Sequence, residues 1–227
     1  MVKLLGSIEL RNISFEYTRD KEIIKDIDIN IKMEDMTCII GPNGSGKTTL
    51  GKLMVGILKP NSGEIYLDGE NIANMSLGQI GRQVGYLFQN PEKQFFSNTV
   101  EDEIKFVLEI KNLNREYIEK KTETLIDLFQ LNHIKSSFPL RLSQGEKQCL
   151  ALAAILINEP RHLILDEPTK GLDMKRRDIL IETLKNFHSK GIGMTVISHD
   201  HIFVNQISSR ILKMCRGEIV EDKRNEH

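Results

Sequence analysis

The sequence predicts an α/β fold with a mainly parallel sheet, extended by an antiparallel β part at the N-terminus and interrupted by an inserted helical subdomain. Residues 8–15 and 27–32 alternate apolar and polar side chains, a pattern typical of strands with one face in water. From residue 36 onward, short apolar runs alternate with helical patterns, an order that builds parallel sheets covered by helices. Residues 100 to about 130 have helical spacing with no strand pattern between them, which indicates an insertion.

The composition is that of a folded protein with a hydrophobic core: of 227 residues, 40% are hydrophobic and 28% are charged. The formal net charge of -1 argues against a strongly basic binding surface, so we expect no nucleic-acid partner. Cys38, Cys149 and Cys215 are scattered singly, without metal or redox spacing. No apolar run approaches the ~18 residues of a membrane-spanning helix. We therefore expect a cytoplasmic protein that reaches a membrane only through a partner.

Short apolar runs mark the elements of the first half of the chain. Residues 36–40, 64–68 and 84–88 have strand patterns, and the turn-forming residues of 59–63 precede the second of them. Residues 50–58 are expected to form an amphipathic helix whose apolar face consists of Leu50, Leu53, Met54 and Ile57.

The second half returns to the alternation of helix and strand after the insertion. The inserted helices carry two apolar faces, one with Ile104, Val107 and Leu108 and another with Leu125, Leu128 and Phe129. Later elements are expected as a helix at 144–158, a strand at 163–165, a charged helix at 175–188 and a strand at 194–197. One domain, residues 1–227, therefore divides into a core (1–90 and 144–227) and a helical subdomain (91–143).

A glycine-rich loop between the strand at 36–40 and the following helix fits the pattern G-x-x-x-x-G-K-[ST] of P-loop NTPases. Its residues are Gly41, Pro42, Asn43, Gly44, Ser45, Gly46, Lys47, Thr48 and Thr49. Glycines let backbone N–H groups surround phosphate oxygens, and the helix N-terminus adds a positive dipole end. Lys47 is suited to the β- and γ-phosphates and Thr48 to a Mg²⁺ ion. The alternative is a glycine-rich turn that happens to precede a lysine, but the flanking strand and helix favour nucleoside triphosphate binding.

Two acids, Asp166 and Glu167, follow the apolar strand at 163–165, at the edge of an α/β sheet where ligands bind. Asp166 is suited to hold Mg²⁺ through water, and Glu167 to orient or deprotonate an attacking water. Acids also end strands without any catalytic role. The phosphate-binding loop in the same chain favours the functional interpretation.

Residues 142–148, Leu-Ser-Gln-Gly-Glu-Lys-Gln, begin a helix and are called the signature segment below. Ser143 and Glu146 have the spacing of a capping box, which explains both residues locally but leaves Gly145 unexplained. With the other motifs, the segment resembles the signature motif of the nucleotide-binding subunits of ATP-binding cassette (ABC) transporters, along nearly the whole chain. The resemblance implies that Ser143, Gln144, Gly145 and Glu146 face the γ-phosphate bound by an opposite subunit.

Other positions match that family one by one. The resemblance implies that Tyr17 stacks on adenine, Gln89 senses Mg²⁺ and the γ-phosphate, Asp173 crosses the dimer interface and His199 contacts the γ-phosphate. Alone, each of these residues is equally compatible with an ordinary structural role. The implied catalytic set is Glu167, His199, Gln89 and Lys47, with ATP as substrate. Mg²⁺, held by Thr48, Gln89 and Asp166, is the implied cofactor.

The signature segment departs from the family pattern at two positions, and a third departure follows it. Gln144 stands where Gly is usual, and Glu146 stands where Gln is usual. A carboxylate facing a phosphate repels it, so we expect Glu146 to cap its own helix instead. Cys149 stands where many relatives carry Arg, which removes one positive charge from this helix.

Residues 90–104 resemble the corresponding region of the ATPases of energy-coupling-factor importers, which take up vitamins and cobalt or nickel ions. That resemblance implies a second ABC ATPase, identical or sister, and a transmembrane coupling subunit as partners. It also implies a peripheral location on the cytoplasmic face of the cell membrane. Phe95 and Phe96 are a candidate docking patch, or alternatively core residues.

The implied mechanism is a head-to-tail dimer that closes on two Mg-ATP and reopens after hydrolysis. Two alternatives remain within the family: a conventional ABC importer ATPase and a soluble ABC ATPase that moves no solute. A small-molecule kinase with the same loop is disfavoured by the signature segment and Glu167.

Overall fold

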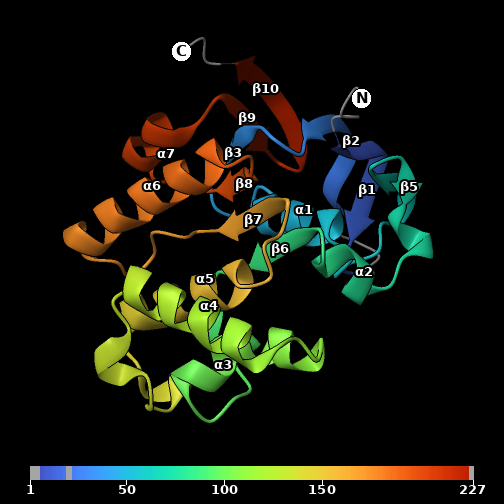
Figure 1. Cartoon of the computed structure of the whole chain (residues 1–227). Coiled ribbons are helices and arrows are strands. Elements are labelled where there is room, and N and C mark those ends of the chain that lie inside the picture. The colour runs from blue at the N-terminus through green and yellow to red at the C-terminus, as the bar shows by residue number, and fades with distance from the viewer. Residues whose placement is uncertain (1–5, 19–21, 225–227) are drawn as a thin grey trace.

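The computed structural model describes residues 6–18 and 22–224, which form two β-sheets and several layers of helix (Figure 1). The smaller sheet is antiparallel and has the strand order β2-β1-β4-β5. Its strands are β1 (Ser7–Glu16), β2 (Glu22–Lys32), β4 (Ser62–Leu67) and β5 (Glu70–Asn71). This sheet is the antiparallel part expected from the alternating pattern at the N-terminus.

The larger sheet has the order β10-β9-β3-β8-β7-β6 and is parallel except for β10. Its strands are β3 (Met36–Ile40), β6 (Val84–Leu87), β7 (His162–Asp166), β8 (Gly193–Ile197), β9 (Arg210–Cys215) and β10 (Glu218–Arg224). The predicted α/β class with a mainly parallel sheet is confirmed. The strands β9 and β10 were not assigned from the sequence.

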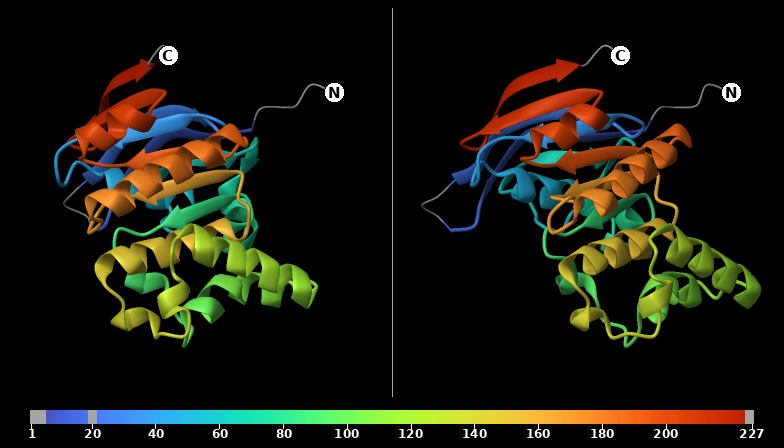
Figure 2. Two further views of the ribbon diagram at one scale, coloured as in Figure 1. Left: turned by 60° about the vertical axis from the view of Figure 1, so that its left-hand side comes forward. Right: turned by 90° about the vertical axis from the view of Figure 1, so that its left-hand side faces the viewer.

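Helices surround the larger sheet, and α3 and α4 form a layer at one end of the molecule, with α5 between them and the sheet (Figures 1 and 2). The helices are α1 (Lys47–Met54), α2 (Leu77–Gly81), α3 (Val100–Ile110), α4 (Arg115–Leu128), α5 (Gln144–Leu156), α6 (Met174–Ser189) and α7 (His201–Ile207). Short 3₁₀ turns lie at 72–74, 91–94, 132–134 and 139–141. In the part of the chain that is described, no helix combines the length and apolarity needed to cross a bilayer.

The helix expected at 50–58 is shifted toward the N-terminus in the structure. It begins at Lys47, directly after the glycine-rich loop, and ends at Met54. Gly56 has a left-handed backbone (φ 70°), which stops the helix because such a conformation suits glycine best. Ile57, assigned to the apolar face, therefore lies outside the helix and is 39% exposed.

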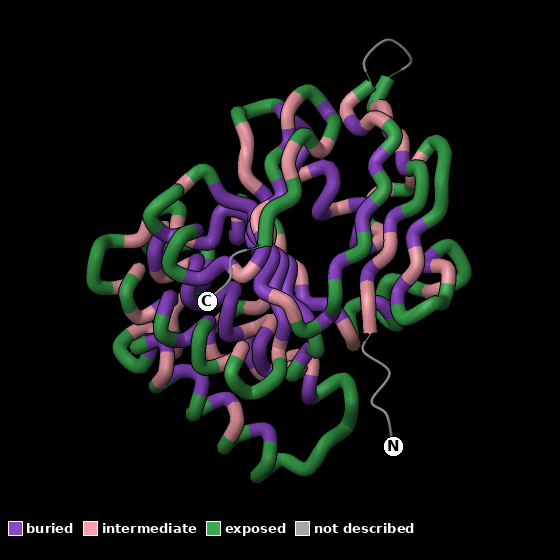
Figure 3. The backbone as a smooth tube through the Cα atoms, turned by 90° about the horizontal axis from the view of Figure 1, so that it is seen from above, coloured by how far each residue is buried: buried purple, intermediate pink, exposed green. Residues whose placement is uncertain are grey.

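Two hydrophobic clusters lie on opposite faces of the larger sheet, because neighbouring residues of a strand point to opposite sides. Ile164 of β7 belongs to the cluster that includes α1 and the smaller sheet. Leu163 and Leu165 belong to the cluster that includes α3 to α7. Figure 3 shows these buried strands at the centre of the molecule. The helical region packs into the second cluster through α5, which contacts both α3 and β6. The subdomain boundaries at 91 and 143 remain a prediction.

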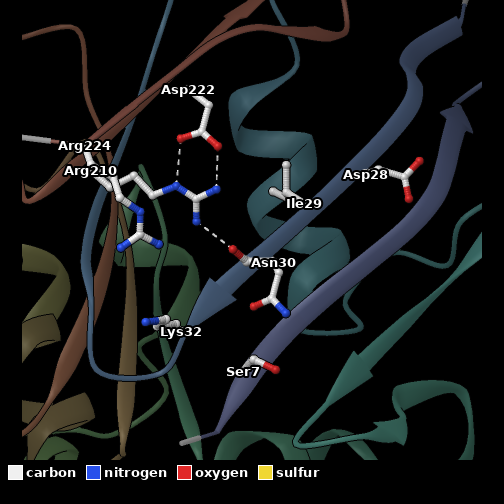
Figure 4. Close-up of a pocket in the computed structure, with 8 residues that line it drawn as sticks. All are labelled: Ser7, Asp28, Ile29, Asn30, Lys32, Arg210, Asp222 and Arg224. Atoms are coloured by element: carbon white, nitrogen blue, oxygen red, sulfur yellow. Dashed lines mark hydrogen bonds and ion pairs between the residues drawn. The ribbon is translucent and has the colours of Figure 1, made fainter.

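Arg210 ties the smaller sheet to the larger one (Figure 4). Its guanidinium donates to both carboxylate oxygens of Asp222 (2.8 and 2.7 Å) and to the backbone oxygen of Asn30 in β2 (2.6 Å). These groups line a polar hollow of about 560 Å³ that also contains Lys32 and Arg224. None of the predicted site residues lines this hollow, and its buried arginine already has its partners.

A second buried polar contact joins the loop before β3 to the centre of the larger sheet. His162, at the start of β7, has no exposed surface. Its Nδ1 lies 3.0 Å from the Met33 carbonyl oxygen, and its Nε2 lies 2.8 Å from the Thr195 hydroxyl. A carbonyl only accepts, so Nδ1 carries the proton and Nε2 accepts from Thr195. Burial lowers the pKa of His162 from 6.5 to about 4.

We expect acidification from pH 7 to pH 5 to lower the free energy of unfolding by about 2 kcal/mol through His162. In the unfolded chain the imidazole gains a proton near pH 6.5, whereas in the native protein it stays neutral until about pH 4. Urea unfolding at pH 7 and pH 5 measures the difference. In His162→Gln, this part of the pH dependence should disappear. An equal loss in both proteins would contradict the assignment.

Candidate nucleotide-binding site

The carboxyl ends of β3, β6, β7 and β8 open onto one pocket of about 380 Å³. Its described lining consists of Tyr17, Ile23, Asn43, Gly44, Gly46, Lys47, Thr48, Thr49, Gln89, Glu167 and Ile197. The fold thus brings together most of the residues predicted to bind ATP within one chain. Ile23 and Ile197 were not predicted; Ile197 ends a buried strand two residues before His199, whereas nothing in the sequence distinguishes Ile23.

The loop between β3 and α1 depends on glycine at close approaches. Gly41 has φ 147°, and a Cβ there would lie 2.1 Å from the Met214 carbonyl oxygen. Gly46, the N-cap of α1, has φ 103°, and a Cβ there would lie 2.8 Å from the Ile24 side chain. No side chain caps α1. The N–H groups of its first turn therefore point toward the pocket without a side-chain partner, as an anion-binding helix N-terminus requires.

Lys47 spans the loop from the first residue of α1. Its Nζ donates to the carbonyl oxygens of Gly41 (2.9 Å) and Pro42 (3.0 Å). The side chain is buried, and burial lowers the pKa of Lys47, opposed by the charges of Glu167 and Asp166. The ammonium group is thus held over the loop at the pocket wall, where a phosphate would meet it.

Thr48, which lines the pocket, forms an oxygen pair with the buried Asp166. The Thr48 hydroxyl donates to Asp166 Oδ1 (3.2 Å), and the carboxyl group is 1% exposed. Asp166 Oδ2 is buried and has no hydrogen-bond partner among the described residues. Burial raises the pKa of Asp166, and the Thr48 hydrogen bond opposes this. A buried carboxylate oxygen without a partner beside a hydroxyl fits a hard divalent cation such as Mg²⁺.

Glu167 follows Asp166 in a left-handed conformation (φ 53°), which is unusual for a residue with a side chain. Its N–H donates to the Ile197 carbonyl oxygen (2.9 Å), which fixes the turn. Its Oε1 lies 2.8 Å from Nδ1 of His199, whose side chain is 70% exposed. Since a carboxylate only accepts, Nδ1 is the donor. The turn places the two neighbouring acids in different environments, because Glu167 lines the pocket and Asp166 is buried against Thr48.

Tyr17 stands at the mouth of the pocket and is 56% exposed. Its hydroxyl lies 3.2 Å from the Thr49 hydroxyl, and its ring packs edge-on against Phe15 with centroids 4.9 Å apart. The ring is therefore oriented yet accessible, as a face for stacking on a base requires.

The signature segment lies outside this pocket, as does Asp173. Ser143 N and Oγ donate to Glu146 Oε2 (2.9 and 2.6 Å), which completes the capping box of α5. The hydrogen bond from Ser143 is the main cause that lowers the pKa of Glu146. The expectation that Glu146 caps its own helix is confirmed. Asp173 likewise caps α6 by accepting from the Arg176 N–H (2.9 Å).

The start of α5 lies directly against the turn before α6. A Cβ on Gly145 would lie 3.3 Å from the Gly171 carbonyl oxygen. A Cβ on Gly171 (φ 77°) would lie 2.5 Å from the Gln144 side chain. A side chain at Gly145, which the capping box leaves unexplained, would therefore crowd this close approach. The signature segment and Asp173 form one continuous surface, separate from the nucleotide pocket.

The chain was compared with known proteins. A family model described as ABC transporter matches residues 24–170. The chain is 38% identical over 212 residues to a putative ABC transporter ATP-binding protein of Pyrococcus horikoshii, covering 93% of this chain and 81% of the relative. It is 40% identical over 215 residues to the energy-coupling factor transporter ATP-binding protein EcfA1 of Streptococcus pneumoniae, covering 93% and 78%.

Two solved structures resemble the fold closely. The cbiO1 protein of Clostridium perfringens, part of the ABC transporter complex cbiONQ, superposes with a TM-score of 0.83 at 30% identity, covering 96% of this chain and 88% of that one. A dimeric bacterial ABC transporter cassette gives a TM-score of 0.89 at 24% identity over 97% and 99%, which supports the fold alone. The chain has the phosphate loop, the paired acids and the signature segment. It belongs to the ABC transporter family and is an ATP-binding and ATP-hydrolysing subunit of an ABC transporter.

Proposed function

We propose that this chain is the ATPase subunit of a membrane importer of the energy-coupling-factor type, working as a head-to-tail dimer on two Mg-ATP. One observation supports the dimer. The two sets of groups that this chain is proposed to use for ATP lie on different surfaces of the molecule. The pocket holds the phosphate loop and Glu167, whereas the signature segment lies outside it. Two copies, or two sister chains, placed head to tail join each pocket to the other subunit's signature segment.

Within one pocket, the proposed roles combine the family resemblance with the positions of the lining residues. The N–H groups of the loop and Lys47 bind the phosphates, and Tyr17 stacks on the adenine. Thr48, Asp166 and Gln89 would hold Mg²⁺, which when bound would neutralise charge on the phosphate oxygens. Gln89 lines the pocket opposite the loop, from the segment after β6.

Hydrolysis requires a water held in line with the γ-phosphate. Glu167 lines the pocket and accepts a hydrogen bond from His199, so its second oxygen is available to orient the water and take its proton. His199, 70% exposed on its side chain, also reaches the γ-phosphate when the dimer closes. Catalysis is therefore mainly a matter of positioning and charge.

The transmembrane partner is proposed to dock on an apolar groove lined by the turn after α1 and by residues of α2, β6, α3 and α5. This groove has a volume of about 290 Å³, and its apolar lining includes Ile57, Leu77, Val107 and Ile155. Leu77 is 61% exposed. An apolar helix of a coupling subunit fits such a groove, and the chain would then sit on the cytoplasmic face of the membrane.

The two phenylalanines of the candidate docking patch have different environments. Phe96 is 61% exposed and packs edge-on against Phe106, with ring centroids 4.3 Å apart. Phe95 is partly buried and packs against the core. Phe96 is therefore retained as a docking residue, whereas Phe95 is a core residue.

The relatives favour the energy-coupling-factor branch. EcfA1 is 40% identical, and the solved cbiO1 is part of the cbiONQ complex. The test is to purify a tagged chain with ATP from its native membranes and identify what accompanies it. A small polytopic protein, with or without a second ATPase, supports the proposal. A pair of conventional permeases would move the chain to another importer class, and purely soluble partners would favour a non-transport ATPase.

We expect Glu167→Gln to lower ATP hydrolysis by at least about 100-fold, because the water loses its proton acceptor. ATP binding should persist, and the variant should accumulate as an ATP-dependent dimer. Phosphate release and size-exclusion chromatography with ATP measure the two effects. Glu182→Gln, on the exposed face of α6, is the matched control. Unchanged hydrolysis in Glu167→Gln would overturn the assignment of the catalytic acid.

We expect Leu77→Glu to release the chain from its membrane partner, because a charge in an apolar groove must lose its hydration on docking. Thermal unfolding of the isolated chain should stay unchanged, since the side chain is mostly exposed. Co-purification from membranes is the measurement. Val220→Glu, on an exposed residue of β10, is the control. Retention of the partner by Leu77→Glu would show that the groove is not the docking site.

A further inference from the structure

Two carboxylates lie on the surface formed by the signature segment and Asp173. Glu146 is in the first turn of α5, and Asp173 is the N-cap of α6. In the head-to-tail dimer proposed above, this surface meets the triphosphate bound by the partner. Each carboxylate repels that triphosphate, and the repulsion grows as closure removes water. A working dimer therefore needs a positive charge close to both acids.

Arg176, in the first turn of α6, is placed between the two acids. One guanidinium nitrogen lies 3.5 Å from Glu146 Oε1, and its Nε lies 4.0 Å from Asp173 Oδ2. The guanidinium also lies against Gly145, where a Cβ would approach its NH1 to 2.8 Å. Its side chain is 32% exposed, so it is half-buried within this surface and not extended into solvent.

The negative charge of Glu146 is not needed for the capping box. The same chain builds an identical box at α2, where Ser76 N and Oγ both donate to Gln79 Oε1 at 2.8 Å. A neutral amide oxygen therefore serves as well in this geometry. The carboxylate of Glu146 brings an additional charge that its local role does not require, and Arg176 offsets that charge.

His133 is the other basic residue near Glu146, with Nε2 3.3 Å from Oε1. Its side chain is 61% exposed, and no ion pair joins it to Asp173 in the described structure. Arg176 carries a permanent charge, whereas a histidine near neutral pH carries at most part of one. Among the described residues, Arg176 is the one whose ion pairs reach both carboxylates.

We propose that Arg176 is a positioning residue for ATP-driven closure. It supplies the counter-charge that lets a glutamate-containing signature segment approach the partner's triphosphate, and it fixes the start of α5 against the start of α6. This inference rests on the proposed head-to-tail dimer. Arg176 acts through Glu146 and Asp173, and its effect is on dimer closure, not on nucleotide binding by the single chain.

The test is a double-mutant cycle on Glu146 and Arg176 in the Glu167→Gln chain. The affinity of the ATP-dependent dimer is measured by sedimentation, and nucleotide binding to the monomer is measured with a fluorescent ATP analogue. Arg176→Ala should weaken the dimer at least about tenfold, because two carboxylates then face the phosphates without a counter-charge. Adding Glu146→Gln should restore most of that loss, whereas monomer binding should not change in any variant.

Two further variants make the outcome decisive. Arg176→Lys keeps the charge and should retain more of the dimer affinity than Arg176→Ala. Lys175→Ala removes a neighbouring exposed cation of α6 and should leave the dimer unchanged. Equal dimers in Arg176→Ala and Lys175→Ala, or a double variant as weak as Arg176→Ala alone, would overturn the role of Arg176. Failure of the parent Glu167→Gln chain to dimerise with ATP would instead overturn the proposed function, and this inference with it.

Discussion

The parallel pairing of β3, β8, β7 and β6 is the constraint on which the nucleotide site depends. These strands leave the sheet at the same edge, and their pairing is in continuous register, with Ile39 beside Ile197 and Asp166 also beside Ile197. Nearly all residues that make this register are buried, and most of them are apolar. Hydrophobic pairing thus fixes the relative positions of groups that come from distant parts of the sequence. The strands before Lys47, Glu167 and His199 end side by side. These three residues therefore lie at the same edge of the sheet.

The alternation of side chains along β7 explains why two adjacent acids lie in different environments. Ile164 belongs to the cluster on the α1 side of the sheet, and Asp166, two residues later, faces the same side and meets Thr48. Glu167 would continue toward the opposite face in a regular strand. Its left-handed backbone ends the strand instead and turns its carboxylate into the pocket beside His199. The left-handed backbone of this single residue thus separates the proposed metal-binding role of Asp166 from the proposed proton-accepting role of Glu167.

Features set by backbone geometry were predictable from the sequence, whereas features set by tertiary contact were not. The glycine pattern of the loop predicted it well, because Gly41 and Gly46 occupy conformations and spaces that exclude side chains. The predicted end of this helix, at residue 58, was wrong. Gly56 stops α1 earlier than the spacing of the apolar residues indicates. Strands β9 and β10 were not assigned, because their apolar runs are short and are interrupted by charged residues. Ile23 enters the pocket only because β2 lies beside the loop, and local patterns contain no such information.

The departures in and after the signature segment are best understood as a redistribution of charge. Cys149 is 8% exposed within the apolar cluster, and burial raises the pKa of its thiol to about 11, so it contributes no charge to α5. The charges of Arg176, Glu146 and Asp173 also act on the pKa of this thiol, Arg176 lowering it and the two acids raising it. Many relatives are expected to carry a positive charge at this position on α5. In this chain Arg176 of α6 supplies a positive charge to the start of α5 instead. A cation on α6 has a consequence that a cation on α5 lacks: it links the signature segment to the turn at Asp173. In the proposed head-to-tail dimer, the signature segment and Asp173 approach the partner's nucleotide together, and this link would hold them as one body during closure.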